Sequence, residues 1–449
     1  MIVTGAGFAY NVCMGSFALR FRKEENDMSV TEAQVNAGYA YAKEIYAAHG
    51  VDVDKAMEKA AGIPISMHCW QGDDVIGFEG SGELTGGIAT TGNYPGRART
   101  ADELRADMDA AMALIPGTKK VNLHASYAEL NGKKIDRDAY TVAEFQNWVD
   151  WAVEKKIGLD FNPTYFSHPK AESGFTLASA DKGVRDFWIE HGKRCREIGE
   201  EFAKATGKPC VINFWMPDGY KDTPADTASP RERMVRALDD IFGAKKISKD
   251  LVQDAVESKL FGIGVESYTV GSHELMYGYA LSRGIMYALD AGHFHPLEYI
   301  SSKISSALQY MPSVLLHVSR GVRWDSDHVI TLDDELQNIM NEIVYNDYTD
   351  RVAIALDYFD ASINRVAAWT IGVRNAQKAL LRALLTPEKA IRECEYNGDL
   401  TGRLALQEEA KTLPFSAVWD AYCMKMGVPV GEDWLKVVRE YEKNVLAKR

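Results

Sequence analysis

Short apolar runs alternate along this chain with longer segments in which apolar residues recur at helical spacing. Eight of the short runs are rich in β-branched, aromatic and leucine residues, as expected for strands that are buried on both faces. They cover residues 63–70, 119–127, 157–165, 209–217, 255–261, 285–293, 313–320 and 351–359. The pattern therefore predicts eight strands.

Amphipathic helices are predicted between these strands, most clearly over residues 101–115, 141–156 and 186–207. The last of these ends on Gly207, which suits a helix C-cap. A further helix is expected over 28–50, opened by Ser29 or Thr31 as N-cap.

A strand followed by a helix, repeated along the chain, predicts a parallel sheet. Eight such units match an α/β fold, the (β/α)8 TIM barrel, with additional N-terminal and C-terminal helices. An open doubly wound sheet is the structural alternative, but no G-x-G-x-x-G motif lies between a strand and a helix here. The sequence thus favours the barrel and gives no support to dinucleotide binding.

Three parts of the chain are expected. Residues 1–27 form an extension of unknown role, residues 28–362 form the catalytic barrel, and residues 363–449 form a helical extension that packs on the barrel or contacts another subunit. The last part reads as helices with little obvious chemistry.

Polar residues arrive late in nearly every predicted strand. Because barrel active sites lie at the C-terminal ends of the strands, this placement indicates a catalytic mouth. The residues concerned are His68, Trp70, His124, Asp160, Asn162, Trp215, Glu257, Lys259, Asp290, His317 and Asp357.

Composition narrows the possible partners. A net charge of -13 opposes binding to nucleic acid, which depends on basic side chains. The sequence contains no run of about 18 apolar residues, the length that a membrane-spanning helix requires. Six cysteines without a C-x-x-C pair fit reduced thiols in a cytoplasmic enzyme better than a disulfide framework.

Carboxylates and imidazoles concentrate in the last four predicted strands and the segments that follow them. A single Asp at a strand end is more often a helix cap, a lone His can be a core residue, and "DSD" can be a solvated turn. So many carboxylates at one mouth would nevertheless repel one another, and bound divalent cations would resolve that conflict. The candidate ligands are Glu257, Asp290, His293, His317, Asp325, Asp327 and Asp357.

Ten motifs together resemble the L-rhamnose isomerase family of the xylose-isomerase-like barrels, from about residue 30 to the C-terminus. They are "MHCWQGDDV", "GNYPG", "GLDFNP", "FSHP", "VESKLFGIG", "ESYTVGS", "LDAGHFHP", "LLHVSR", "RWDSDHV" and "LDYFDASINR". The resemblance implies a homotetramer that interconverts L-rhamnose and L-rhamnulose in rhamnose catabolism. The first 27 residues fall outside it.

The resemblance also implies two metal ions. The residues matching the structural ion, Zn2+ or Mn2+, are Glu257, Asp290, His317 and Asp357. Those matching the catalytic ion, expected to be Mn2+, are His293, Asp325 and Asp327, with Glu257 able to bridge the two.

The same likeness places Trp70, His124, Trp215, Lys259 and Asp357 around the sugar. The aromatic faces are expected to pack against its C–H groups. Lys259 is expected to donate to a sugar oxygen, His124 to assist ring opening as an acid or base, and Asp357 to lie near the proton that moves between O1 and O2. We therefore expect catalytic roles for these last three residues.

The expected reaction is a metal-assisted 1,2-hydride shift on the open-chain sugar. The alternatives are a two-metal hydrolase, a related sugar isomerase or ketose 3-epimerase that acts on a rare sugar, and a sugar-binding protein whose metal only orders the fold. The acidic balance argues against the hydrolysis of nucleic acid. An epimerase needs two opposed carboxylates around one metal, whereas this ligand set suits two ions.

The stretch "HCWQGDD", residues 68–74, is expected to end the first strand. Trp70 would then face the sugar, with His68 and Cys69 as packing residues. Gly72 would allow the turn, and Asp73 with its acidic neighbour would belong to the loop that follows.

Overall fold

The computed structural model describes residues 30–80, 88, 90–262, 264–320 and 328–449. The expected extension 1–27 therefore lies outside the described residues. Among the described helices, none combines the length and the apolar character that crossing a bilayer requires.

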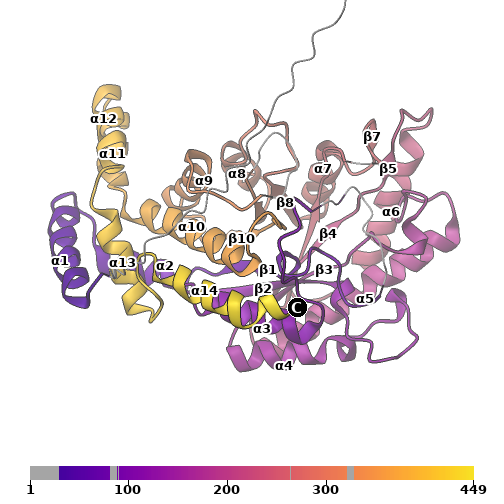
Figure 1. Ribbon diagram of the computed structural model, residues 1–449. Helices are drawn as coiled ribbons and strands as arrows, with labels where there is room; N and C mark the ends of the chain where they lie inside the picture. The colour runs from indigo at the N-terminus through magenta and orange to yellow at the C-terminus, as the bar shows by residue number, and fades with distance from the viewer. Residues whose placement is uncertain (1–29, 81–87, 89, 263, 321–327) are drawn as a thin grey trace, which may run out of the picture.

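Eight parallel strands close into a barrel with the order β1-β10-β9-β8-β6-β4-β3-β2 (Figure 1). They are β1 (Ile65–His68), β2 (Lys119–His124), β3 (Gly158–Asn162), β4 (Cys210–Trp215), β6 (Val252–Glu257), β8 (Met286–Asp290), β9 (Val314–Val318) and β10 (Val352–Leu356). Seven lie inside the predicted runs, while β6 starts before its run and ends at Glu257. The predicted barrel is confirmed.

Two further short strands, β5 (Gly219–Tyr220) and β7 (Tyr268–Thr269), pair antiparallel outside the barrel. β5 follows β4 and β7 follows β6 along the chain, so this pair links the segments beyond two neighbouring barrel strands.

Helices follow the barrel strands and cover the outside of the sheet (Figure 1). They are α3 (Ala101–Met112), α4 (Gln146–Lys155), α5 (Lys182–Thr206), α6 (Ala228–Ala244), α7 (His273–Arg283), α8 (Ser301–Leu308), α9 (Asp334–Tyr345) and α10 (Arg365–Leu385). The predicted C-cap at Gly207 is confirmed, since its φ of 66° lies in the left-handed region that glycine adopts readily.

The remaining helices precede β1 or follow α10. They are α1 (Glu32–Ala48), α2 (Val53–Gly62), α11 (Glu388–Tyr396), α12 (Leu400–Ala410), α13 (Phe415–Lys425) and α14 (Asp433–Asn444). Of the two residues expected to open the first helix, Thr31 is the N-cap, and it forms a capping box with Gln34. In Figure 1, α1, α11 and α12 lie to one side, away from the barrel strands.

Alternate residues of the strands serve two cores. Residues such as Val256, Leu289 and Leu316 belong to the large cluster that joins the sheet to the surrounding helices. A second cluster consists only of strand residues and fills the barrel with small and medium side chains: Val211, Ala255, Met286, Ala288, Leu315 and Ala355.

The seam between β1 and β10 closes the barrel. Its ladder is short, with Ile65 opposite Ile354 as one of two register pairs. Side chains extend the closure beyond the ladder, because Gln71 exchanges two hydrogen bonds with the backbone of Asp360, at 3.0 and 2.8 Å. The indole N–H of Trp369 also donates to the His68 carbonyl at 2.8 Å.

Asp160 does not lie at the mouth, contrary to the sequence-based expectation. It lies deeper in β3 than Asn162, at the N-terminal end of the barrel, which we call the floor. There its carboxylate meets Lys120 Nζ at 2.5 Å, Ser66 Oγ at 2.7 Å and the Val211 N–H at 2.8 Å. Two residues along a strand keep the same face but differ by about 7 Å in depth.

Candidate active site

A cavity of about 600 Å³, including its open mouth, lies at the C-terminal ends of the barrel strands. Eight of the predicted site residues line this cavity: Trp70, His124, Trp215, Glu257, Lys259, His293, His317 and Asp357. The residues that the sequence pattern places late in the strands are thus brought together at one mouth.

Four side chains converge at the bottom of the cavity. Glu257, Asp290 and His317 lie on β6, β8 and β9, and Asp357 directly follows β10. Each offers one ligand atom, and these atoms all lie within 4.8 Å of one another. The parallel register explains the convergence, because Asp290 is directly opposite His317 in the ladder.

Glu257 lies between the two histidines. Its Oε1 is 2.8 Å from His293 Nδ1, and its Oε2 is 3.1 Å from His317 Nδ1. The same His317 nitrogen is 3.6 Å from Asp290 Oδ2 and 3.3 Å from Asp357 Oδ2. His317 Nδ1 is therefore directed at the point where three carboxylates meet.

Burial and neighbouring charges shift the pKa values of the residues in this cluster in opposite directions. Burial lowers the pKa of His317, but the charge of Glu257 and the nearness of Asp290 and Asp357 outweigh it and raise that pKa well above the usual value. Burial alone would raise the pKa of Glu257, yet the two histidines bring it well below the usual range. Burial raises the pKa of Asp290 to about 7. Protons are therefore needed to balance the cluster.

A divalent cation fits these residues. His317 Nδ1 is buried and makes no well-formed hydrogen bond to any residue that the structure describes, although three carboxylate oxygens surround it. Carboxylate oxygens and an imidazole nitrogen are ligands that Mn, Co and Zn accept. A cation would replace the protons that the buried cluster otherwise holds.

Asp325 and Asp327, the other two predicted metal ligands, lie outside the described residues. His293 is described, and it adjoins the cluster through Glu257, with its Nδ1 4.0 Å from Asp290 Oδ2.

Aromatic side chains form the walls of the cavity. Trp70 is 2% exposed, and its indole N–H donates to Asp357 Oδ1 at 2.9 Å. Trp215 stacks on the His293 ring, with 6.1 Å between the ring centroids and 9° between the planes. Lys259 lies with its Nζ 4.7 Å from the centre of the Trp215 ring. The tryptophans thus contact both the cavity and the polar cluster.

His124 lies beside Trp70 in the cavity wall. Its ring lies 4.5 Å from the Trp70 ring in an edge-to-face arrangement and 5.5 Å from the Phe166 ring. Burial lowers its pKa to about 3, with the charge of Arg137 acting in the same direction. The imidazole is therefore neutral at physiological pH.

Asn162, expected at the mouth, lines the cavity as well. Six further lining residues were not among those predicted: Val75, Ile88, Thr164, Phe166, Asn213 and Phe359. Asn213 donates from its Nδ2 to Glu257 Oε2. A signal for it existed, since Asn213 lies two residues before Trp215 and so shares its strand face. Thr164 and Phe166 belong to an irregular loop after β3, where no periodicity could have indicated them.

The residues after Trp70 differ in part from expectation. Gly72 has an ordinary φ of -81°, so it is not required by the turn. A Cβ there would lie 2.3 Å from Leu104 and 2.5 Å from Trp369, and close packing is therefore the reason for a glycine. Asp73 and Asp74 do follow in the loop, but both are buried.

The closed barrel and the buried carboxylate and imidazole cluster beneath an aromatic-walled cavity define an α/β-barrel protein with a candidate divalent-metal centre. Residues 33–449 match the family model described as L-rhamnose isomerase (RhaA). The chain belongs to the L-rhamnose isomerase family.

Curated relatives agree with this assignment. The L-rhamnose isomerase of Rhodopirellula baltica is 59% identical over 416 residues, which are 92% of this chain and 97% of that protein. The L-rhamnose isomerase of Mannheimia succiniciproducens is 58% identical over 92% of this chain and 99% of its own length. Among solved structures, an L-ribulose 3-epimerase superposes with a TM-score of 0.45 at 12% identity, covering 71% of this chain and 95% of that one.

Proposed function

We propose that this protein is an L-rhamnose isomerase that interconverts L-rhamnose and L-rhamnulose. One observation carries the proposal: a chain that matches this family over residues 33–449 brings Glu257, Asp290, His317 and Asp357 together at the bottom of a cavity with tryptophan walls. A buried cluster of this kind suits two neighbouring sugar oxygens, and the tryptophans suit the C–H faces of a sugar.

Divalent cations would be held in two places. Glu257, Asp290, His317 and Asp357 would hold the structural ion, Zn2+ or Mn2+, which their convergence within 4.8 Å supports. His293 with Asp325 and Asp327 would hold the catalytic ion, Mn2+. The position of Glu257, with one carboxylate oxygen facing each histidine, supports a bridging role.

A bound divalent cation supplies Lewis acidity, which stabilises negative charge that develops on the sugar oxygens during isomerisation. The chain itself supplies orientation. Trp70 donates to Asp357 Oδ1 and so fixes the carboxylate that would serve the proton moving between O1 and O2. Lys259, 3% exposed and held against Trp215, would donate to a sugar oxygen.

Exclusion of water is the second contribution of the chain. Trp70, Phe166 and Trp215 surround the cavity with apolar surface, which strengthens every electrostatic interaction inside it. His124, neutral in this environment, would exchange a proton with the sugar as the pyranose ring opens.

Isomerisation of L-rhamnose deuterated at C2, in ordinary water, tests the proposal. We expect metal-stripped protein to be inactive, and we expect Mn2+ to restore turnover with the label retained at C1. Loss of the label to solvent would instead favour a proton-transfer route that uses His124, Lys259 or Asp357 as the base. Rhamnose binding without turnover after metal loading would contradict the isomerase and favour a sugar-binding protein.

The location and assembly of the protein extend this proposal. The five described cysteines are all free, which supports a reducing compartment such as the cytoplasm. A homotetramer is supported by exposed apolar side chains on the outlying α11 and α12, such as Tyr396 at 77% and Leu400 at 56% exposure. Analytical ultracentrifugation should give four times the mass of one chain.

The proposed division of the chain is residues 1–27, 28–362 and 363–449. The third part begins with α10, whose buried Val366 and Trp369 belong to the same cluster as the barrel wall. Limited proteolysis followed by mass spectrometry would locate the boundaries.

A further inference from the structure

The loop that follows β3 adopts a costly backbone conformation. Thr164 has a φ of 57° and Ser167 a φ of 52°, both in the left-handed region. A β-branched residue rarely adopts this region, because its Cβ substituents crowd the backbone. Surrounding groups must therefore hold the loop in place.

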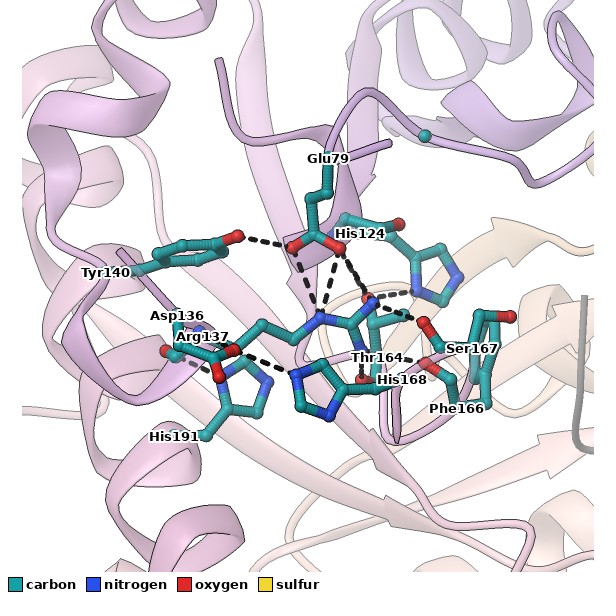
Figure 2. A network of polar contacts seen from close by, with 12 residues as sticks. Glu79, His124, Asp136, Arg137, Tyr140, Thr164, Phe166, Ser167, His168 and His191 are labelled. Carbon is teal, nitrogen blue, oxygen red and sulfur yellow. Dashed lines mark hydrogen bonds and ion pairs between the residues drawn. The ribbon is translucent and has the colours of Figure 1, made fainter. Parts of the chain in front are cut away.

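Arg137 is the group that holds it. Its side chain is 1% exposed, and its Nη1 donates to the carbonyl oxygens of Thr164 at 2.6 Å and Phe166 at 2.8 Å. Its Nη2 donates to the Ser167 carbonyl at 3.3 Å. One guanidinium thus binds three carbonyls of the same short loop, as Figure 2 shows.

Glu79 balances the buried charge of Arg137. The carboxylate accepts from Nε at 3.1 and 3.2 Å and from Nη2 at 2.8 Å, and it also accepts from the Tyr140 hydroxyl at 2.6 Å. Glu79 comes from the segment after β1, and Arg137 from the segment after β2 (Figure 2). Three consecutive loops at the mouth are therefore joined through one ion pair.

The Thr164 hydroxyl is placed by this arrangement against the cavity histidine. It donates to the Asn162 carbonyl at 3.3 Å and accepts from the Ser126 N–H at 3.4 Å. Its third neighbour is His124 Nδ1, at 2.9 Å. A hydroxyl has one proton to donate and two lone pairs, so with its proton on the Asn162 carbonyl the remaining lone pair is available to a proton on His124 Nδ1.

We propose that Thr164 is a positioning residue, which selects the Nδ1–H tautomer of His124 and leaves the Nε2 lone pair for the sugar, and that the Arg137–Glu79 pair holds Thr164 for this role. The inference rests on the proposed function, because it specifies how His124 acts in that reaction. In a neutral imidazole, the hydrogen bond at one nitrogen decides which nitrogen carries the proton.

The tautomer decides what His124 can do. When the pyranose opens, Nε2 accepts the O1 proton, the O1–H electron pair forms the C1=O1 bond, the C1–O5 bond breaks, and O5 takes a proton from water. The hydroxide that this leaves then takes the proton from Nε2 and returns His124 to its neutral form. The other tautomer would present an N–H at Nε2 and could not accept that proton. Thr164 therefore acts on ring opening through His124, without touching the reacting atoms.

Thr164→Val and Thr164→Ser form a matched pair that tests the proposal. Valine keeps the shape and removes the hydroxyl, and we expect kcat to fall about tenfold with KM little changed, as for the loss of one aligned hydrogen bond. Serine restores the hydroxyl and should recover most of that loss. Thermal melting and metal content identify variants that are simply misfolded, and Thr164→Ala then replaces the valine variant.

A spectroscopic measurement separates this inference from the proposed function, since it requires no turnover. In 15N-histidine-labelled protein, the His124 signals, assigned by their absence in His124→Asn, should show the proton on Nδ1. They should move toward the Nε2–H form or a mixture in Thr164→Val. An Nε2–H tautomer in the unsubstituted protein, or unchanged tautomer and kcat in the valine variant, would overturn the inference. An inactive unsubstituted protein with the Nδ1–H signal would overturn only the isomerase.

Discussion

The two ends of the barrel both bury carboxylates, but they treat them differently. At the floor, Asp160 is surrounded by a lysine, a hydroxyl and a backbone N–H, so protein groups satisfy its charge. At the mouth, Glu257, Asp290 and Asp357 converge on the imidazole of His317, and Glu257 also contacts His293. A balanced carboxylate stabilises a fold, whereas an excess of carboxylates indicates that a cation belongs there.

Glu257→Gln should disrupt the candidate metal centre at the mouth, and we expect it to have the largest effect on activity. It removes the carboxylate that contacts both histidines, and because outer-shell changes already cost 10–100-fold, isomerase activity should fall by more than about a hundredfold. Mass spectrometry of bound metal should show lost ions, while circular dichroism shows an intact barrel. Full metal content with full activity would contradict the placement of the metal centre.

Lys120→Met should destabilise the fold at the floor and leave the metal centre at the mouth unchanged. It leaves the Asp160 carboxylate buried beside an apolar side chain, so the free energy of unfolding should fall by about 3 kcal/mol. Lys208→Met is the matched control, since partly buried Lys208 donates to a backbone carbonyl, that of Lys156, and its loss should cost about 0.5 kcal/mol or less. Urea titration measures both, and bound metal should be unchanged in each.

His68→Gln should reduce the pH dependence of the free energy of unfolding, because His68 is a buried imidazole that must stay neutral in the folded state. Burial lowers the pKa of His68 to about 3, below the unfolded value of about 6.5, so the unfolded chain binds more protons between these values. The stability from neutral His68 is complete above about pH 6.5 and is lost as the pH falls. Between pH 6.5 and 5 the loss is on the order of 2 kcal/mol.

Urea titrations of the two proteins with chelator present, at pH 5 and 7.5, measure this dependence. The glutamine variant should lose less stability on acidification than the unsubstituted chain. Equal losses in the two proteins would mean that His68 does not carry the pH dependence.

Trp70→Phe should have the smallest effect. It keeps an aromatic wall and removes the N–H that donates to Asp357, so kcat should fall about tenfold, the value of one hydrogen bond to a charged group. Steady-state kinetics with L-rhamnose checks this, and retained metal content is the control. A fall in affinity alone would assign Trp70 to sugar binding only.

Periodicity and strand-end chemistry predicted much of this molecule. All eight strands were found because each is a short apolar run, and the mouth residues were found because polar groups such as Glu257 and Asp290 end those runs. Depth within a strand was harder, since Asp160 and Asn162 share a face and only the structure shows which reaches the cavity. The two-residue period of a strand predicts which face a side chain is on, but it does not predict how deep in the barrel that side chain lies.

Contacts between distant loops could not be predicted. Arg137 and Glu79 are 58 positions apart, and Thr164 lies in a loop whose shape depends on that pair. Gly72 shows the same limit, because its close neighbour Trp369 lies in α10, far later along the chain. Such features arise from three-dimensional packing, which no local pattern records.

The seam between β1 and β10 also affects the order in which the contacts of the barrel form during synthesis and folding. Trp70 and Asp357 meet at 2.9 Å although 287 positions separate them, and Gln71 reaches Asp360 across a similar interval. On the ribosome the first strand emerges long before its partner exists, and contacts of such long sequence separation form late. A nascent chain cut short before Val352 therefore lacks both the last strand of the barrel and Asp357, one of the four converging side chains.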